Sequence, residues 1–251
     1  MTVDYGLKGK VALVTGAASG FGSRIASSLV EEGCVVYLAD INLSAVRRIS
    51  QSLGEMTNAL EMDVGHASDV DAKVKAIEGR QGRVDILVNN AGILKIGPVA
   101  DASVEDWDQV CRVNLSGVFY CSKAVVPVMT KVRSGKIINI ASISAFKGGG
   151  VFGNVLYGTT KAGVVAMTKG FARELGPFGI NVNAIAPGLA DTGMTNQYLD
   201  DEKRRQVSQL VPMGRLATTT DIATLVTFLA SDASSYVTGE TITVDGGYMT
   251  K

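Results

Sequence analysis

The amino-acid sequence predicts an α/β fold, a single doubly wound parallel sheet of about seven strands with helices on both faces. Short runs rich in β-branched and aliphatic residues alternate with longer segments of helical periodicity from end to end of the chain. The length of 251 residues, the 46% hydrophobic content and the 29 glycines suit one large core with many tight turns. Because no linker or internal repeat divides the sequence, we expect one domain over residues 1–251.

The alternation defines the expected elements in order. The strands are expected at Val11–Thr15, Val35–Asp40, Ala59–Asp63, Ile86–Asn90, Lys136–Ala141, Asn181–Ala186 and Thr241–Asp245. The main helical patterns run over Ser23–Glu32, Val104–Val132, Tyr157–Leu175 and Thr220–Ala230. Parallel strands need long crossovers, and helical crossovers bury both faces of a sheet, so this order predicts the doubly wound arrangement.

Residues 189–216 interrupt the alternation. This stretch is charged at Asp200–Arg205 and ends with Pro212 and Gly214. Such a segment suits a substrate lid over a site, and an ordinary helical insertion explains it equally well.

Charge and composition exclude several classes of function. The 24 basic and 24 acidic residues cancel, and no long basic run is present, so no nucleic-acid partner is expected. The three cysteines lack metal-ligand spacing, so they are interpreted as reduced thiols and no metal is expected. No apolar stretch approaches the ~20 residues of a membrane span, so we expect no membrane partner and a cytoplasmic location.

A glycine-rich turn, Thr15-Gly16-Ala17-Ala18-Ser19-Gly20-Phe21-Gly22, joins the first strand to a helix. Glycines let the backbone approach a pyrophosphate, and a helix N-terminus offers unpaired N–H groups to an anion. The spacing differs from G-x-G-x-x-G, and no Gly-Lys-Ser/Thr follows, which disfavours nucleoside triphosphate hydrolysis. Mere tight packing is the alternative explanation of this turn.

Asp40 ends the second strand, 20 positions after Gly20. A carboxylate there can accept hydrogen bonds from an adenosine ribose, and it would repel a 2′-phosphate. Neither Ile41 nor Asn42 supplies a compensating cation. The sequence therefore favours NAD over NADP as the cofactor. Asp40 as a simple helix N-cap remains the alternative.

Tyr157 and Lys161 are spaced i, i+4, which places the phenol and the ammonium on one face of a helix. A tyrosine titrates near a pKa of about 10, so action as a base near neutral pH requires a downward shift of about 3 units. Lys161 and the positive ring of an oxidised nicotinamide would both stabilise the phenolate. Taken alone, this pair is also common by chance on solvated helices.

With these motifs in place, the chain resembles the short-chain dehydrogenase/reductase family, which has a Rossmann-type fold, over essentially its whole length. The match includes the glycine-rich turn, Asp63-Val64 after the third strand and Asn89-Asn90-Ala91-Gly92 after the fourth. The resemblance implies catalytic roles for Asn114, Ser142, Tyr157 and Lys161. It implies hydrogen bonding of the substrate oxygen by Ser142, a water held in a proton relay by Asn114, and proton transfer by Tyr157. Together with the glycine-rich turn and Asp40, it implies cofactor contacts at Gly16, Ser19, Gly20, Phe21, Gly22, Asp40, Asp63, Val64, Asn90, Ala91, Gly92, Tyr157, Lys161, Pro187, Gly188, Leu189 and Thr192.

The sequence departs from the family between Ser142 and Tyr157. Their separation is 157 − 142 = 15 positions, about two more than is usual in the family. The intervening segment is rich in glycine, so it can bulge and still deliver both side chains. Phe21 also replaces a residue that is commonly aliphatic in the family.

Our leading hypothesis from the sequence is an NAD(H)-dependent oxidoreductase that interconverts a secondary alcohol, polyol or sugar and its ketone. A 3-oxoacyl thioester reductase and a non-catalytic nucleotide-binding scaffold are the alternatives. The resemblance implies a homotetramer. A modest uncharged substrate is expected from the pocket candidates Leu94, Ser144, Phe146, Phe152 and Met194. The only histidine, His66, is interpreted as a surface or capping residue, and Trp107 as packing on one side of a helix.

Overall fold

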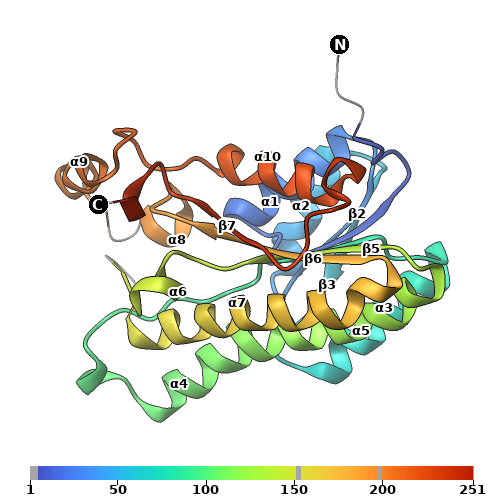
Figure 1. Ribbon diagram of the computed structural model, residues 1–251, viewed down its shortest axis with the longest axis horizontal. Helices are drawn as coiled ribbons and strands as arrows, with labels where there is room; N and C mark the ends of the chain where they lie inside the picture. Colours follow the sequence, from blue (N-terminus) through green and yellow to red (C-terminus); the bar gives the residue numbers. More distant parts are fainter. Residues whose placement is uncertain (1–4, 151–153, 197–198, 251) are drawn as a thin grey trace.

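The computed structural model describes residues 5–150, 154–196 and 199–250. Within these residues, seven parallel strands form one sheet in the order β3-β2-β1-β4-β5-β6-β7 (Figure 1). The strands are β1 (Val11–Thr15), β2 (Val35–Asp40), β3 (Thr57–Glu61), β4 (Ile86–Asn89), β5 (Gly135–Ile140), β6 (Ile180–Pro187) and β7 (Thr241–Val244). The predicted doubly wound α/β fold is confirmed, and the third strand begins two residues earlier than expected.

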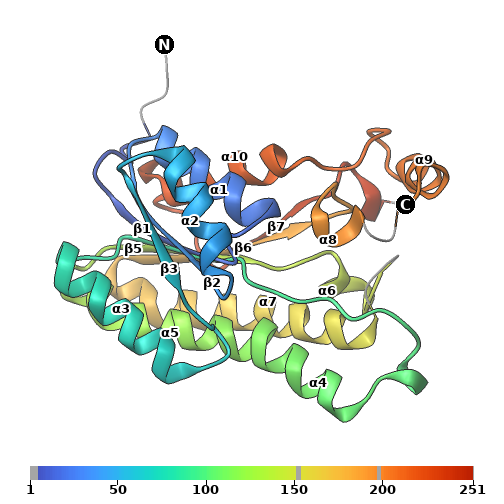
Figure 2. The same cartoon turned by 180° about the vertical axis from the view of Figure 1, so that it is seen from behind.

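Helices cover both faces of the sheet, as Figures 1 and 2 show from opposite sides. One face carries α1 (Gly20–Glu31), α2 (Leu43–Leu53) and α10 (Thr219–Ala230). The other carries α3 (Ala67–Gln81), α4 (Val104–Cys111), α5 (Gly117–Val132) and α7 (Val155–Leu175). Short 3-10 turns lie at Val99–Asp101, Gly176–Phe178, Asp232–Ser234 and Tyr248–Thr250.

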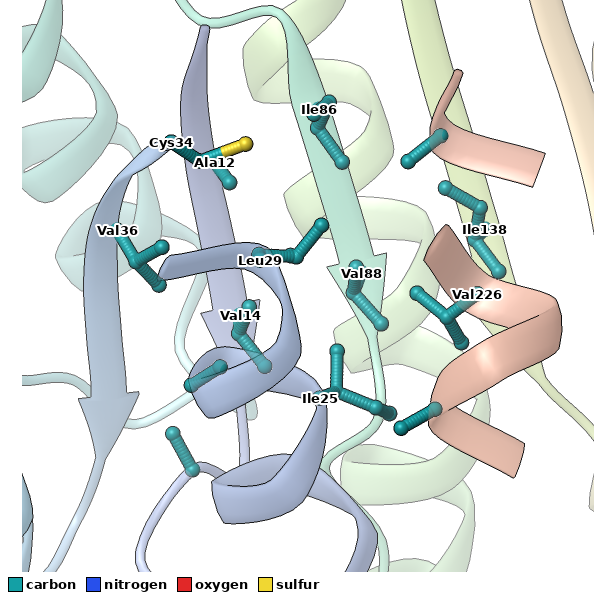
Figure 3. Packing of buried hydrophobic residues seen from close by; sticks show 14 of the residues in the cluster. Ala12, Val14, Ile25, Leu29, Cys34, Val36, Ile86, Val88, Ile138 and Val226 are labelled. Atoms are coloured by element: carbon teal, nitrogen blue, oxygen red, sulfur yellow. The ribbon is translucent and has the colours of Figure 1, made fainter. Parts of the chain in front are cut away.

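Alternating side chains of the central strands build two separate cores. Val14 and Val88 point toward Ile25 of α1 and Val226 of α10 (Figure 3). Their neighbour Leu13 belongs to the opposite core, with α3 and α5. Because successive side chains of a strand face opposite sides, nearly every residue of a doubly covered strand is apolar and buried.

The long helix predicted over Val104–Val132 differs from the structure in one respect. A π-helical turn, η2 (Arg112–Ser116), separates α4 from α5 without breaking the helical path. A π turn widens the helix by one residue, and such turns are frequent at functional sites. Its centre is Asn114, which is fully buried. Trp107 on α4 is 42% exposed, so it packs only partly.

Three short helices gather at the carboxyl end of the sheet, near the C-terminal segment (Figure 1). They are α6 (Ser144–Lys147), α8 (Gly193–Asn196) and α9 (Asp201–Leu210). Leu199 and Val207 form a small apolar cluster of their own with Leu216 and Leu189. The described part of segment 189–216 therefore contains two helices and is locally packed, and its service as a lid stays a prediction.

None of the described helices is both long enough and apolar enough to cross a membrane.

Candidate active site

A cavity of about 250 Å³ opens at the carboxyl end of the sheet. Its walls come from the segments that follow β1, β2, β4, β5 and β6, together with α7. The strand order reverses between β1 and β4, so the loops after these strands diverge and leave a crevice. Most of the site residues that the sequence predicts lie on this cavity: Gly16, Ser19, Gly20, Phe21, Asp40, Asn90, Ala91, Gly92, Ser142, Tyr157, Lys161, Pro187, Gly188, Leu189 and Thr192.

The glycine-rich turn leaves no room for side chains at two positions. At Gly16, where φ is +64°, an added Cβ would lie 2.7 Å from the Cα of Ala91. At Gly22 an added Cβ would collide with the Gly16 carbonyl. The Ser19 side chain caps none of the first amides of α1, whose residues Gly20 and Phe21 face the cavity. This is a close backbone approach beside a helix N-terminus, the arrangement that binds a pyrophosphate.

Asn90 holds the glycine-rich turn in place. Its Nδ2 donates to the carbonyls of Thr15 and Gly16 at 2.9 and 3.0 Å. In return, the Thr15 hydroxyl oxygen accepts from the backbone N–H groups of Asn90 and Ala91 at 3.0 and 3.1 Å. These four hydrogen bonds tie the loop after β1 to the loop after β4 across the crevice.

Asp40 lies on the cavity wall with part of its hydrogen-bonding capacity unused. Its Oδ2 accepts from the Ala18 amide at 3.1 Å, and its Oδ1 accepts from the Asn42 amide at 2.9 Å. The N-cap of α2 is Asn42, whose side chain accepts from Ala45 N–H, so the N-cap interpretation of Asp40 is wrong. No ion pair to Asp40 exists among the described residues. A carboxylate has about four acceptor sites, so Asp40 can also accept from ribose hydroxyls.

Three of the predicted cofactor residues do not line this cavity: Gly22, Asp63 and Val64. The side chain of Val64 is buried in the core. The Asp63 carboxylate accepts from Gly65 N–H at 2.8 Å and lies 2.9 Å from the exposed His66 ring. Contact of Asp63 and Val64 with an adenine therefore stays a prediction.

The predicted catalytic pair lies on the cavity side of α7. The Lys161 ammonium is 5.7 Å from the centre of the Tyr157 ring and donates to the Ile140 carbonyl at 2.7 Å. The Lys161 side chain is almost fully buried, with 3% of the residue exposed. Ser142 follows β5, and its hydroxyl oxygen accepts from the Ser144 amide at 3.1 Å. The Ser142 hydroxyl also lies near enough to the Tyr157 phenol to lower its pKa.

Asn114 supports this cluster from behind rather than lining the cavity. Its Oδ1 accepts from Ile93 N–H at 2.8 Å, and its Nδ2 donates to the Ile93 carbonyl at 2.9 Å. An added Cβ at Gly92 would lie 3.4 Å from the Asn114 oxygen and 3.6 Å from the Lys161 ammonium. The π turn thus presents Asn114 to the backbone that passes over Lys161.

Burial moves the two titratable groups in opposite directions. It raises the pKa of Tyr157 to about 12, against a smaller lowering effect of the Ser142 hydroxyl. It lowers the pKa of Lys161 to about 8. The downward shift that the sequence argument required of Tyr157 is therefore not supplied by the protein's own groups. At neutral pH the phenol is protonated, so this site holds a proton donor.

The glycine-rich segment after Ser142 is seated directly on α7. A Cβ at Gly158 would lie 2.5 Å from the Gly148 carbonyl carbon and 2.6 Å from the Gly149 nitrogen. Asn154 then caps α7, because its side chain accepts from the amides of Leu156 and Tyr157. The longer connection therefore still delivers Tyr157 and Ser142 to one cavity.

Of the pocket candidates, Leu94 and Ser144 line the cavity. Phe146 is 50% exposed and does not line it. Phe152 and the side chain of Met194 lie outside what the structure describes. The loop between Ser142 and Tyr157, which we expect from the sequence to border the substrate, reaches the cavity through Lys147 and Gly150, whereas sequence reasoning missed Thr195 and Tyr248. The position of Lys147 beside the Ser142 segment was an available signal, whereas nothing in the sequence brings the C-terminal Tyr248 to this place.

Comparisons with known proteins agree with this geometry. A family model described as enoyl-(acyl carrier protein) reductase matches residues 16–249. The 3-oxoacyl-[acyl-carrier-protein] reductase FabG of Vibrio cholerae is 42% identical over 241 residues, which covers 96% of this chain and 98% of that protein. FabG of Thermotoga maritima is 40% identical over 247 residues, covering 96% and 98%.

Solved structures are similar throughout the fold. The 3-ketoacyl-(acyl-carrier-protein) reductase of Brucella melitensis, complexed with NADH, has a TM-score of 0.90 at 35% identity and covers 96% of this chain and 99% of its own. A short-chain type dehydrogenase/reductase from Mycobacterium marinum has a TM-score of 0.93 at 32% identity and covers 98% and 97%. The fold and the cavity are typical of an oxidoreductase that uses a nicotinamide dinucleotide cofactor. The chain belongs to the short-chain dehydrogenase/reductase family.

Replacing Gly158 tests how the segment after Ser142 is seated. We expect Gly158→Ala to destabilise the protein by about 1–3 kcal/mol, because the new methyl group meets backbone rather than flexible side chains. Gly170→Ala, on the same helix with nothing near its Cβ position, is expected to stabilise by about 0.5–1 kcal/mol. Urea-induced unfolding measures both. Equal changes in the free energy of unfolding for the two substitutions would contradict the close packing of Gly148 and Gly149 against Gly158.

The pH dependence of stability tests the burial of Lys161. Between pH 8 and its ordinary pKa of 10.5, the unfolded chain binds more protons at Lys161 than the folded protein does. The free energy of unfolding therefore rises with pH in this window, and the cost of the buried ammonium is fully present below pH 8. Relative to Lys161→Met, the wild type should gain about 1–2 kcal/mol from pH 7 to pH 9.5. Urea unfolding at both pH values measures this gain, with Lys75→Met, an exposed lysine on α3, as the control. If the difference in the free energy of unfolding between the wild type and Lys161→Met does not change with pH, the lowered pKa of Lys161 is disproved.

Proposed function

We propose that the protein reduces the 3-oxo group of an acyl thioester with NADH, and that Tyr157 donates the proton. The observation that carries the chemistry is geometric: Ser142, Tyr157 and Lys161 line one wall of the cavity, with the Lys161 ammonium 5.7 Å from the centre of the Tyr157 ring. The substrate class rests on the relatives, 40–42% identical over nearly the whole chain, that are 3-oxoacyl-[acyl-carrier-protein] reductases. These relatives favour the thioester alternative over the alcohol, polyol or sugar of our leading hypothesis.

The residues present fit a nicotinamide dinucleotide. The close approach at Gly16 and the N-terminus of α1 suit the pyrophosphate, and Asp40 suits the adenosine ribose. The segment from Pro187 to Thr192 lines the same cavity, and the family resemblance expects it to contact the nicotinamide carboxamide. When bound, a reduced nicotinamide supplies the hydride that adds to the carbonyl carbon.

The chain's own residues handle the oxygen of the substrate. In this proposal, the hydroxyl of Ser142 donates a hydrogen bond to the carbonyl oxygen and orients it. The Tyr157 phenol transfers its proton to that oxygen as negative charge develops there. The Lys161 ammonium, 5.7 Å from the Tyr157 ring centre, stabilises the resulting phenolate. Asn114 holds the Ile93 backbone beside this group, and its service in a water relay stays a prediction.

A second candidate is the oxidation of a secondary alcohol, polyol or sugar. The observation in its favour is the longer connection between Ser142 and Tyr157, which borders the cavity at Lys147 and Gly150. This connection distinguishes the chain from the usual family pattern at the place where substrates differ. A purely nucleotide-binding scaffold is disfavoured, because Ser142, Tyr157 and Lys161 converge on one cavity.

We further propose that the family's usual homotetramer forms here and that segment 189–216 serves as the lid. Trp107 and Phe119 are each 42% exposed on α4 and α5, which suits burial against another copy.

The lid proposal is supported by Leu189, Thr192 and Thr195, which line the cavity at the start of that segment.

Removing the phenol hydroxyl tests the proton donor. We expect Tyr157→Phe to lower kcat for 3-oxoacyl thioester reduction by about 10²–10⁴-fold, because no other group supplies the proton at that place. NADH affinity should change little. Tyr236→Phe, at a fully exposed tyrosine, is the matched control. Following NADH absorbance with a 3-oxoacyl thioester measures turnover. Full activity of Tyr157→Phe would refute the assignment.

Cofactor preference tests Asp40. We expect kcat/KM with NADH to exceed that with NADPH by at least about tenfold, because the carboxylate repels a 2′-phosphate. Asp40→Ser should reduce this preference, whereas Asp71→Ser, at an exposed position on α3, should preserve it. Higher activity of the wild type with NADPH at equal concentration would overturn the assignment of NAD.

A further inference from the structure

A lysine lies at the edge of the cavity against the face of a tyrosine. The Lys147 ammonium, at the end of α6, is 4.4 Å from the centre of the Tyr248 ring and 3.4 Å from its hydroxyl oxygen. Both residues line the cavity. Lys147 comes from the segment that follows Ser142, and Tyr248 from the C-terminal segment, so the pair bridges two walls of the cavity.

Lys147 differs from the other lysine on this cavity. Lys161 is buried and donates to the Ile140 carbonyl, within reach of Tyr157. Lys147 is exposed, and no ion pair to it occurs among the residues that the structure describes. The only carboxylate lining the described cavity is Asp40, at the end of β2 beside the glycine-rich turn. The charge of Lys147 is therefore available to a ligand in the cavity.

Tyr248 is held rigidly as the platform for this lysine. The Asp245 carboxylate accepts from the amides of Gly247 and Met249 at 2.9 and 2.8 Å. An added Cβ at Gly247 would lie 3.0 Å from the Pro212 ring, so the turn before Tyr248 packs against the segment after α9. A cation over an aromatic face is attracted by the ring. A lysine has three N–H donors, so donation to the Tyr248 hydroxyl leaves others for an oxyanion.

Lys147 lies close to Ser142 along the chain. It follows Ser142 by 147 − 142 = 5 residues, and a single helical turn lies between them. One turn of helix advances the chain by about 5.4 Å. Ser142 and Lys147 both line the cavity, so one ligand can contact both.

We propose that Lys147, positioned by Tyr248, is a specificity-determining residue that binds an oxyanion of the substrate, a carboxylate or a phosphate. This inference rests on the proposed function, since it names the charge of the substrate at the same site. It replaces the uncharged substrate expected from the sequence. The oxyanion belongs either to the acyl part of the thioester or to its thiol part, and the recognising chemistry is the same for both.

Pairs of substrates that differ in one charged group test the proposal. Four 3-oxoacyl thioesters are used as substrates, each with NADH as the reductant. Those of pantetheine and pantetheine 4′-phosphate form one pair, and those of N-acetylcysteamine without and with a carboxylate at the acyl terminus form the other. In the wild type, at least one charged thioester should show a kcat/KM about 10-fold to 100-fold above its uncharged partner. Lys147→Met should remove this preference, because it lowers kcat/KM for the charged thioester far more than for the uncharged one. The charged thioester that loses its advantage identifies the part that carries the oxyanion.

Lys75→Met is the control, because Lys75 is exposed on α3 and does not line the cavity. Equal loss on all four thioesters in Lys147→Met would show that the Lys147–Tyr248 contact is only structural. No preference in the wild type would likewise overturn the proposal.

Binding without turnover separates this proposal from the proposed function. The matching 3-hydroxyacyl thioesters cannot react with NADH, so calorimetry of these ternary complexes measures affinity alone. Tighter binding of a charged thioester that is lost in Lys147→Met supports the oxyanion site even where no 3-oxoacyl thioester is reduced, and in that case only the proposed reaction fails. Equal affinities within both pairs in the wild type overturn the oxyanion site.

Discussion

The site depends on one close approach of backbone between the loops that follow β1 and β4. Gly16 and Ala91 come so near that no side chain fits between them, and Asn90 and Thr15 close the gap with reciprocal hydrogen bonds. This contact exists only because the strand order reverses at these two strands. It sets the floor of the cavity, and the glycine-rich turn, α1 and the Gly92 backbone all take their positions from it.

The second constraint is the burial of charge beside that floor. Lys161 lies on α7 with its side chain inside the protein, where the ammonium donates a hydrogen bond to a backbone carbonyl rather than to a carboxylate. A carboxylate partner would neutralise the ammonium, whereas a carbonyl leaves its full charge to act on Tyr157. Burial raises the pKa of the Tyr157 phenol and lowers that of the Lys161 ammonium. The same low-polarity environment therefore favours Tyr157 as a proton donor and opposes the lysine charge that would stabilise its conjugate base.

The substrate side of the cavity is built differently from the cofactor side. Its walls are the segment after Ser142, the start of segment 189–216 and the C-terminal turn at Tyr248. These segments meet through glycines and short turns rather than through paired strands, and Gly158 and Gly247 mark two of the contacts. Loops of this kind change length without disturbing a sheet. The longer connection between Ser142 and Tyr157 is accommodated for this reason.

The sequence by itself determined the sheet, its helical cover and most of the cofactor wall. These features follow from local periodicity, from glycines at a strand end and from the i, i+4 spacing of Tyr157 and Lys161. Tertiary structure alone decided the π turn at Asn114, the direction of the pKa shift of Tyr157 and the meeting of Lys147 with Tyr248. The last two residues are 101 positions apart. No local pattern encodes such a contact, because it depends on how separate loops pack after the sheet has formed.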